Sequence, residues 1–290
     1  ALIRNFRRYS WLLMYLFGAS PCLDKSFVNG KAHTLDPFDD KGSYYKPYAT
    51  SLRMGDLGYH NNAQSSLAIS AIRPKRTTQK TETPRHALNE RGIEYIEVRC
   101  LDLNPFLELG ISAQQIDFLD TFLSYCLLSD SPLINDKECI RLDKNFDLAV
   151  NRGREPNLEL KGPNGSISPQ QWASQLIDEM SKVATTLDKG TSDSRYGKAL
   201  EEQKAKILHP ELCPSAQVLS IMREESLSWI DFAGELAFKH KSCLLSDFPN
   251  KEAVLNELAT NAKQSFLDEQ VIRSSDEICF EDFLKQYQTE

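Results

Sequence analysis

From residue 92 the chain reads Gly92-Ile93-Glu94-Tyr95-Ile96-Glu97-Val98-Arg99-Cys100-Leu101, a run typical of a β-strand because β-branched and aromatic residues dominate it. Successive side chains of a strand point to opposite faces, here Ile96, Val98 and Cys100 against Tyr95, Glu97 and Arg99. Glu97 suits a divalent cation, because Mg²⁺ prefers carboxylate oxygens. Arg99 suits a phosphate or carboxylate group that accepts two parallel hydrogen bonds. The alternative is a salt bridge along the strand face.

The composition limits the class of protein. The chain has 290 residues, of which 41% are hydrophobic, enough for one large domain or two small ones. The net charge of −7 argues against non-specific nucleic-acid binding as the main function. The seven cysteines are odd in number and contain no CxxC pair. This pattern is typical of reduced thiols in a cytoplasmic protein rather than of a disulfide framework.

The start of the chain is apolar from Trp11 to Phe17, but this run is too short to span a bilayer. A packed helix over residues 1–17 is expected, with Gly18 at its C-terminal cap and Pro21 beyond it. The alternative is a signal peptide with its cleavage site near Gly18. Because the helix begins with neither a cap nor an initiator Met, the chain is expected to be a fragment of a longer protein.

Two further stretches are candidate ligand loops. Residues 44–59 combine several tyrosines with Arg53 and two glycines, which allow the backbone to approach a ligand closely. Arg73-Pro74-Lys75-Arg76 places three cations in four residues and could hold a polyphosphate. A solvated basic loop is the alternative for the second stretch.

After residue 110 the pattern becomes helical. Ser112-Ala113-Gln114-Gln115 is a capping box, and Ser168-Pro169 begins a helix that runs to Lys189-Gly190. Further helices are expected over residues 199–208, 215–225, 229–240, 252–267 and in the tail 274–290. The sequence contains no glycine-rich phosphate loop, no histidine pair with metal spacing and no GxSxG nucleophile elbow. Any catalysis is therefore expected to depend on carboxylates, arginines and a metal.

Five ordered motifs resemble the glutamate–cysteine ligases of gammaproteobacteria. They are Tyr15-Leu16-Phe17-Gly18-Ala19-Ser20-Pro21, Tyr48-Ala49-Thr50-Ser51-Leu52-Arg53, Asp56-Leu57-Gly58-Tyr59, Ile72-Arg73-Pro74-Lys75-Arg76 and the stretch 92–99, continued by Leu103-Asn104-Pro105-Phe106. The later part matches loosely, at Gly153-Arg154, Pro156 and Leu158. Two departures stand out. The family has an earlier segment with an E-x-E pair of metal ligands, and it has several dozen residues between the positions of Ser70 and Ala71.

The resemblance implies an α+β fold, similar to glutamine synthetase and the guanidino kinases, with a curved antiparallel sheet and a helical C-terminal part. Residues 1–110 would hold the C-terminal part of the catalytic sheet and the substrate loops, and residues 111–290 the helical region packed on it. The first half of the site would be missing from the fragment. We expect a spatial gap between Ser70 and Ala71, where the additional residues would lie. A natural deletion of these residues is the alternative.

The resemblance also implies a reaction. ATP would phosphorylate the γ-carboxylate of L-glutamate, and the amine of L-cysteine would displace phosphate, which is the first step of glutathione biosynthesis. By position, Glu97 is similar to a ligand of Mg²⁺ or Mn²⁺. Arg99 is similar to a catalytic contact to the phosphoryl group or substrate, and Arg53 and Tyr59 to residues of the amino-acid pocket. A nucleotide-binding role for Arg73, Lys75 and Arg76 is a further hypothesis.

The expected partners are L-glutamate, L-cysteine and ATP, with glutathione as a feedback inhibitor and with neither nucleic acid nor membrane. The protein is expected to be a cytoplasmic monomer. Two alternatives come from other classes. A guanidino-kinase-like phosphotransferase would need a reactive cysteine, for which only Cys100 is close to the motifs. A non-catalytic helical interaction protein is the other.

Overall fold

The computed structural model describes residues 1–28, 34–55, 71–79, 82–246 and 250–289. The chain divides into two compact units. The first unit holds Ala1–Ile72 and Val98–His240, and the second holds Arg73–Glu97 and Lys241–Glu290. A helix that precedes residue 110 contacts helices that follow it, and the boundary expected at residue 110 stays a prediction.

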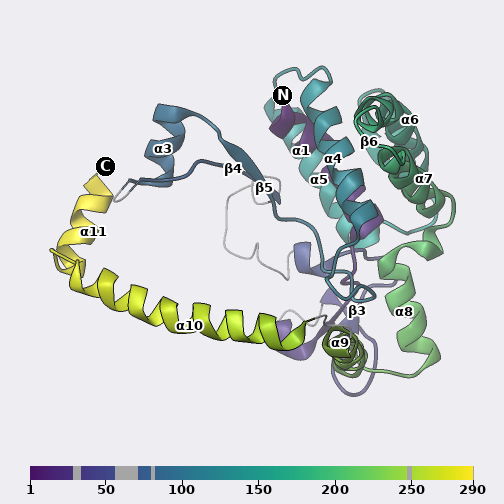
Figure 1. Ribbon diagram of the computed structural model, residues 1–290. Helices are drawn as coiled ribbons and strands as arrows, with labels where there is room; N and C mark the ends of the chain where they lie inside the picture. The colour runs from purple at the N-terminus through teal and green to yellow at the C-terminus, as the bar shows by residue number, and fades with distance from the viewer. Residues whose placement is uncertain (29–33, 56–70, 80–81, 247–249, 290) are drawn as a thin grey trace. The chain divides into compact units, whose positions relative to one another are not determined.

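The first unit is built around α1 (Leu2–Phe17). Helices α4 (Ala113–Leu128), α5 (Asp136–Arg152) and α7 (Arg195–Leu208) all contact it, and α6 (Pro169–Asp188) packs on α4 and α7. Figure 1 shows α1, α4 and α5 side by side. Aromatic pairs join α1 to its neighbours: Phe6 to Phe122, Trp11 to Trp172 and Phe17 to Phe118, with ring centroids 5.9, 4.9 and 5.4 Å apart.

The apolar run from Trp11 to Phe17 is buried throughout, with at most 3% of any side chain exposed. The prediction of a packed helix that ends at Gly18 is therefore confirmed. None of the described helices is long and apolar enough to cross a membrane. Burial of seven consecutive residues requires neighbours on every side of the helix, and these neighbours include α4, α5, α7 and α8 (Pro214–Glu224), together with Trp172 of α6.

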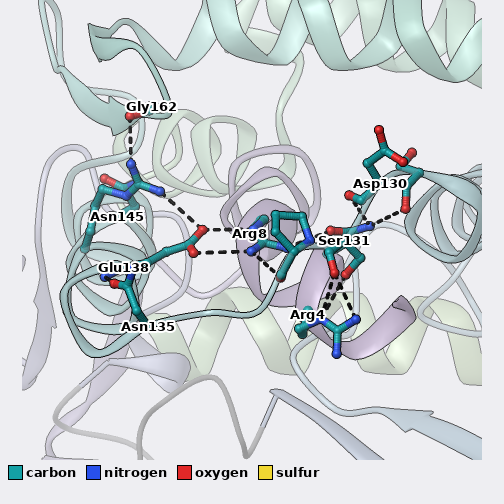
Figure 2. Close-up of polar contacts among 12 residues, drawn as sticks. Arg4, Arg8, Asp130, Ser131, Asn135, Glu138, Asn145 and Gly162 are labelled. Atoms are coloured by element: carbon teal, nitrogen blue, oxygen red, sulfur yellow. Dashed lines mark hydrogen bonds and ion pairs between the residues drawn. The ribbon is translucent and has the colours of Figure 1, made fainter.

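Polar side chains fix α1 against the start of α5 and the turn before it (Figure 2). The Arg8 guanidinium donates to both carboxylate oxygens of Glu138 at 2.9 and 3.2 Å, and these two side chains are only 11% and 17% exposed. Arg4 donates to the carbonyl and hydroxyl oxygens of Ser131 at 2.9–3.2 Å. The Asn5 amide donates to carbonyls at the end of α4, including Cys126 at 3.0 Å. Two arginines and an asparagine in the first half of α1 thus anchor it to its neighbours.

The predicted helix starts are confirmed at two sites. The Ser112 hydroxyl accepts from the amide of Gln115 at 3.1 Å, and the Ser168 hydroxyl accepts from the amide of Gln171 at 3.2 Å. Helix α5 was not expected, although Asn135 caps it in the same way. Its apolar residues Leu142, Phe146, Ala149 and Val150 recur at helical spacing and are buried, so the sequence carried both signals for this helix.

Small sheets and short helices complete the first unit. Strands β1 (Cys22–Asp24), β3 (Ser43–Tyr45) and β2 (Asp36–Pro37) form one antiparallel sheet in that order, and β6 (Leu160–Gly162) pairs with β7 (Gly165–Ile167). The remaining elements are the short helices η1 (Lys25–Phe27), η3 (Leu52–Met54) and η4 (Pro210–Leu212), and α9 (Trp229–Ser246), which continues into the second unit.

The second unit contains most of a hairpin, together with α3 (Pro84–Arg91), α10 (Lys251–Ser274) and α11 (Phe280–Thr289). The hairpin pairs β4 (Ile72–Lys75) with β5 (Tyr95–Val98). The partners run in opposite directions, since the amide of Glu94 donates to Lys75 and that of Arg99 to Ala71.

Strand β5 is shorter than the expected stretch of residues 92–101. Gly92 has a φ of +71° and ends α3, so it is a helix cap and not a strand residue. At the other end, the carbonyls of Cys100 and Leu101 bind a side chain and not a neighbouring strand. The strand prediction was right in its centre and wrong at both ends.

Candidate active site

The central feature of the first unit's motif region is the ion pair between Arg53 and Asp102. The Arg53 Nε donates to Asp102 Oδ1 at 2.6 Å. Its Nη2 donates to the carbonyl oxygens of Cys100 at 3.0 Å and Leu101 at 2.9 Å. The Asp102 side chain is only 4% exposed, and that of Arg53 is 28% exposed. The guanidinium therefore holds the segment that directly follows β5.

Asp102 also binds the segment that follows α1. Its Oδ2 accepts from the backbone amide of Ala19 and from the hydroxyl of Ser20, both at 2.8 Å. With the Arg53 contact, the carboxylate accepts hydrogen bonds from three groups. A buried carboxylate is stable only when its charge is balanced and its oxygens are hydrogen-bonded, and both conditions are met.

Thr50 lies between two helix ends in this region. Its amide donates to the carbonyl of Val150 at 2.9 Å and its hydroxyl to that of Ala149 at 3.0 Å, both at the end of α5. A Cβ on Gly18 would lie 2.6 Å from the Thr50 carbonyl oxygen, and a Cβ on Gly153 would lie 2.8 Å from the Thr50 methyl group. Both glycines are therefore required by close approach and not by a left-handed backbone.

We call this arrangement the motif junction: residues 18–20, 50–53 and 100–102, held together by Asp102. Backbone bonds reinforce it, because the Leu52 amide donates to the Ser20 carbonyl at 2.7 Å and the Ser20 amide to the Thr50 carbonyl at 3.2 Å. Three motifs that are distant in the sequence thus meet in one place. Asp102 was missed as a candidate, although it is the single acid in the apolar run Cys100-Leu101-Asp102-Leu103.

Arg99 lies at the edge of the junction, directly after β5. Its amide donates to the Ala71 carbonyl at 2.8 Å, and its side chain is exposed. The neighbouring Cys100 is fully buried, and burial raises the pKa of its thiol to about 12. A thiol that stays protonated is a poor nucleophile, so Cys100 does not fit the reactive cysteine that the guanidino-kinase alternative needs.

The remaining described candidates belong to the second unit, where they form ion pairs across the hairpin. Lys75 Nζ lies 3.0 Å from Glu97 Oε2, and both side chains are 38% exposed. Arg76 Nε lies 3.7 Å from Glu94 Oε2, which also accepts from the amide of Thr77. Arg73 is exposed. Glu97 therefore forms a salt bridge across the hairpin, to Lys75, whereas the one considered along the strand face would join it to Arg99.

Hydrogen bonds from the amide and hydroxyl of Thr77 hold the pKa of Glu94 below its usual range. The Arg76 charge acts in the same direction. Two cations of the basic stretch, Lys75 and Arg76, therefore pair with acids of the facing strand region.

Two expectations lie outside the described residues. Tyr59 is one of them, and the spacing between Ser70 and Ala71 is the other, since only Ala71 is described. For the metal, the described residues contain no group of three or more His, Cys, Asp or Glu side chains that could hold an ion. Glu97 is ion-paired and Asp102 is saturated by donors, so these residues do not by themselves fit a divalent cation.

One family model, that of the glutamate–cysteine ligases, matches residues 1–71 and 68–149, which together are about half of the chain. The two matched segments meet at residues 68–71. A curated glutamate–cysteine ligase from Hahella chejuensis is 40% identical over 100% of this chain, and one from Azotobacter vinelandii is 39% identical over 99%. The alignment with the Hahella protein spans 344 positions, so it is longer than the 290 residues of this chain.

Solved structures agree with these relatives. The crystal structure of a Francisella tularensis glutamate–cysteine ligase in complex with AMP has a TM-score of 0.86, at 28% identity, over 99% of this chain. A Pasteurella multocida bifunctional glutathione synthetase has a TM-score of 0.60 at 18% identity, which supports the fold alone. The chain spans 65% and 63% of the length of the two curated relatives and 66% of the Francisella chain. The α+β fold is thereby confirmed, and the chain belongs to the glutamate–cysteine ligase family.

Proposed function

We propose that the protein containing this chain ligates the γ-carboxyl group of L-glutamate to the amine of L-cysteine with hydrolysis of ATP to ADP and phosphate. This is the first step of glutathione biosynthesis. The observation that carries the proposal is the 40% identity to the Hahella ligase over the whole chain. The AMP in the Francisella structure supports an adenine nucleotide as the co-substrate.

The reaction has two bond-forming steps. A γ-carboxylate oxygen of glutamate attacks the γ-phosphorus of ATP, and ADP leaves. The amine nitrogen of cysteine, after losing a proton, attacks the acyl carbon, and phosphate leaves with the electrons of the acyl C–O bond. Negative charge develops on the phosphoryl group in the first step and on the acyl oxygen in the second, so cationic donors that are already in place accelerate both.

Arg99 is the best candidate for such a donor. Its side chain is exposed, while its backbone is fixed by the bond to Ala71 and by the two carbonyls that Arg53 holds. Arg53 uses Nε and Nη2 in the junction, so its Nη1 is the edge through which it would bind a substrate carboxylate. Arg73, Lys75 and Arg76 remain candidates for the nucleotide phosphates.

For the metal, we retain Mg²⁺ or Mn²⁺ as the cofactor and Glu97 as one proposed ligand. A divalent ion would neutralise charge on the nucleotide phosphates. The described residues do not fit a complete metal site, so no step above runs through the ion. Tyr59 also remains a proposed residue of the amino-acid pocket. From the resemblance we further propose a cytoplasmic monomer with glutathione as feedback inhibitor.

The test is ADP formation by the intact protein with ATP, Mg²⁺ and amino acids. Glutamate and cysteine together should give sustained ADP release, and neither alone should give more than a small fraction of that rate. Guanidino compounds such as arginine and creatine should not act as phosphoryl acceptors. A folded protein that releases no ADP with glutamate and cysteine would contradict the proposal, and phosphorylation of a guanidino compound would favour the kinase alternative.

A further inference from the structure

The motif junction contains an acid to which the proposed chemistry gives no role. Asp102 is almost fully buried and takes hydrogen bonds from three donors, so it is not available to a substrate or a metal ion. Its partners come from two segments that are distant in the sequence, the end of α1 and the loop with Arg53. A side chain with this environment acts through the groups that it orients.

The first group that it orients is the Arg53 guanidinium. The 2.6 Å bond to Nε fixes one edge of the planar group, and the carbonyls of Cys100 and Leu101 fix Nη2. The direction of Nη1 is then set by the plane, because the guanidinium is rigid. Without the carboxylate, the long side chain would regain several rotamers, and Nη1 would no longer point in one direction.

The second group is the backbone that carries Arg99. The Arg99 amide is bound by Ala71 on one side, and the next two carbonyls are bound by Arg53 on the other. Since Arg53 is itself held by Asp102, the carboxylate contributes to fixing the start of the Arg99 side chain. The two arginines thus depend on one buried acid.

We propose that Asp102 is a positioning residue for the ligase reaction: it sets the direction of Arg53 toward glutamate and the backbone position of Arg99. This inference rests on the proposed function. A misplacement of about 1 Å in such groups can reduce the rate about a hundredfold, although the fold is kept. Replacing a purely structural acid would instead lower the amount of folded protein, and the measured rate would fall equally for all substrates.

The test compares Asp102→Asn with Glu138→Gln in the intact protein. Both substitutions neutralise a mostly buried carboxylate that accepts from an arginine Nε, at 2.6 Å and 2.9 Å respectively. Glu138 ties α1 to α5 at Arg8 (Figure 2). It is not a member of the motif junction, so Glu138→Gln is the matched structural control. The kinetic constants are measured per folded molecule for ATP, glutamate and cysteine, together with a thermal melt.

For Asp102→Asn we expect kcat/KM for glutamate to fall about 10- to 100-fold while KM for ATP stays within about twofold of the wild type. Glu138→Gln should lower the melting temperature and keep kcat/KM for glutamate. The proposal is overturned if Asp102→Asn keeps its kcat/KM per folded molecule, if Glu138→Gln loses as much, or if KM rises equally for all three substrates.

Hydrogen exchange separates this inference from the proposed function. If wild-type protein forms no ADP with glutamate and cysteine, the proposed function fails, and exchange at the Arg99 amide decides whether Asp102 positions that segment. We expect this amide, bonded to Ala71, to exchange at least about tenfold faster in Asp102→Asn and unchanged in Glu138→Gln. Equal exchange in wild type and Asp102→Asn would overturn the positioning role.

Discussion

The motif junction and the β4–β5 hairpin use the same residue types in opposite ways. In the junction, Asp102 is 4% exposed and its oxygens bind three donors from two segments. On the hairpin, Glu97 and Lys75 are both 38% exposed and lie on adjacent strands. A buried ion pair is tolerated only when every charged atom has a hydrogen-bond partner. An ion pair at the surface contributes little to stability, so its side chains can bind a ligand instead. Burial thus separates acids that build the site from acids that could act in it.

The largest effect is expected when the buried pair is broken. Asp102→Ala leaves the Arg53 guanidinium with an uncompensated charge, which typically costs about 3–5 kcal/mol in the free energy of unfolding. Glu97→Ala on the hairpin should cost less than about 1 kcal/mol, because that pair is solvated. Chemical denaturation of both variants measures the difference. Equal losses in the two variants would show that burial does not distinguish the regions.

Arg99→Lys should affect turnover and spare the fold. Lysine keeps the charge but not the two parallel donors of the guanidinium. Loss of one oriented donor typically costs about 3 kcal/mol in the barrier, so turnover should fall about a hundredfold or more. ADP release with glutamate and cysteine gives the rate, and a thermal melt gives the stability. An early melt with normal turnover of the remaining folded protein would make Arg99 a structural residue.

Alkaline pH should destabilise the first unit through its buried thiols. Burial raises the pKa of Cys22 and Cys100 to about 12 and that of Cys213 to about 11. In the unfolded chain these thiols lose their protons near their ordinary pKa of about 8.5, while the folded chain keeps them, so stability should fall as pH rises from about 9 to 11. Each thiol contributes at most about 1.4 kcal/mol per pH unit.

The control for this pH dependence is Cys100→Ala. Between pH 9 and 11 this variant should lose less free energy of unfolding than the wild type, by the amount that one thiol contributes. Denaturation midpoints at pH 8, 9, 10 and 11 measure the slope. A slope that is the same with and without Cys100 would mean that this thiol ionises in the folded protein.

The smallest change in stability is expected for Glu97→Gln, which removes one member of a half-exposed pair and should cost less than about 1 kcal/mol. If Glu97 binds the metal, turnover should nevertheless fall sharply and the Mg²⁺ concentration for half-maximal rate should rise. Glu94→Gln on the same hairpin is the control, because Glu94 is similarly paired, with Arg76. Near-normal turnover of Glu97→Gln at saturating Mg²⁺ would show that Glu97 is not a metal ligand, and its ion pair with Lys75 would then be its role.

The sequence was most informative where local chemistry decides the structure. The caps at Ser112 and Ser168, the burial of residues 11–17 and the centre of β5 follow from capping geometry and hydrophobic patterning. Family motifs supplied Arg53, Glu97 and Arg99 as candidates. Their partners could not be predicted in this way.

What escaped prediction depends on tertiary contacts. Asp102 is marked locally only as the single acid of an apolar run, and its contacts could not be predicted because its donors are 49 to 83 residues away along the chain. The C-terminal end of β5 was overestimated for the same reason, since the carbonyls of Cys100 and Leu101 accept hydrogen bonds from the distant Arg53 side chain. Helix α5 differs, because its Asn135 cap and its apolar residues at helical spacing are visible in the sequence, and only its contacts with α1 are tertiary.

The position of Thr50 has a consequence for the order in which the protein folds. Its bonds reach the carbonyls that end α5, about 100 residues later in the chain, and its carbonyl lies against the end of α1. Those acceptors exist in the right place only after both helices have formed and docked, and closing so long a loop is slow. The junction is therefore expected to assemble after the folding transition state. Thr50→Ala should speed unfolding and leave the refolding rate almost unchanged, with a φ-value near zero.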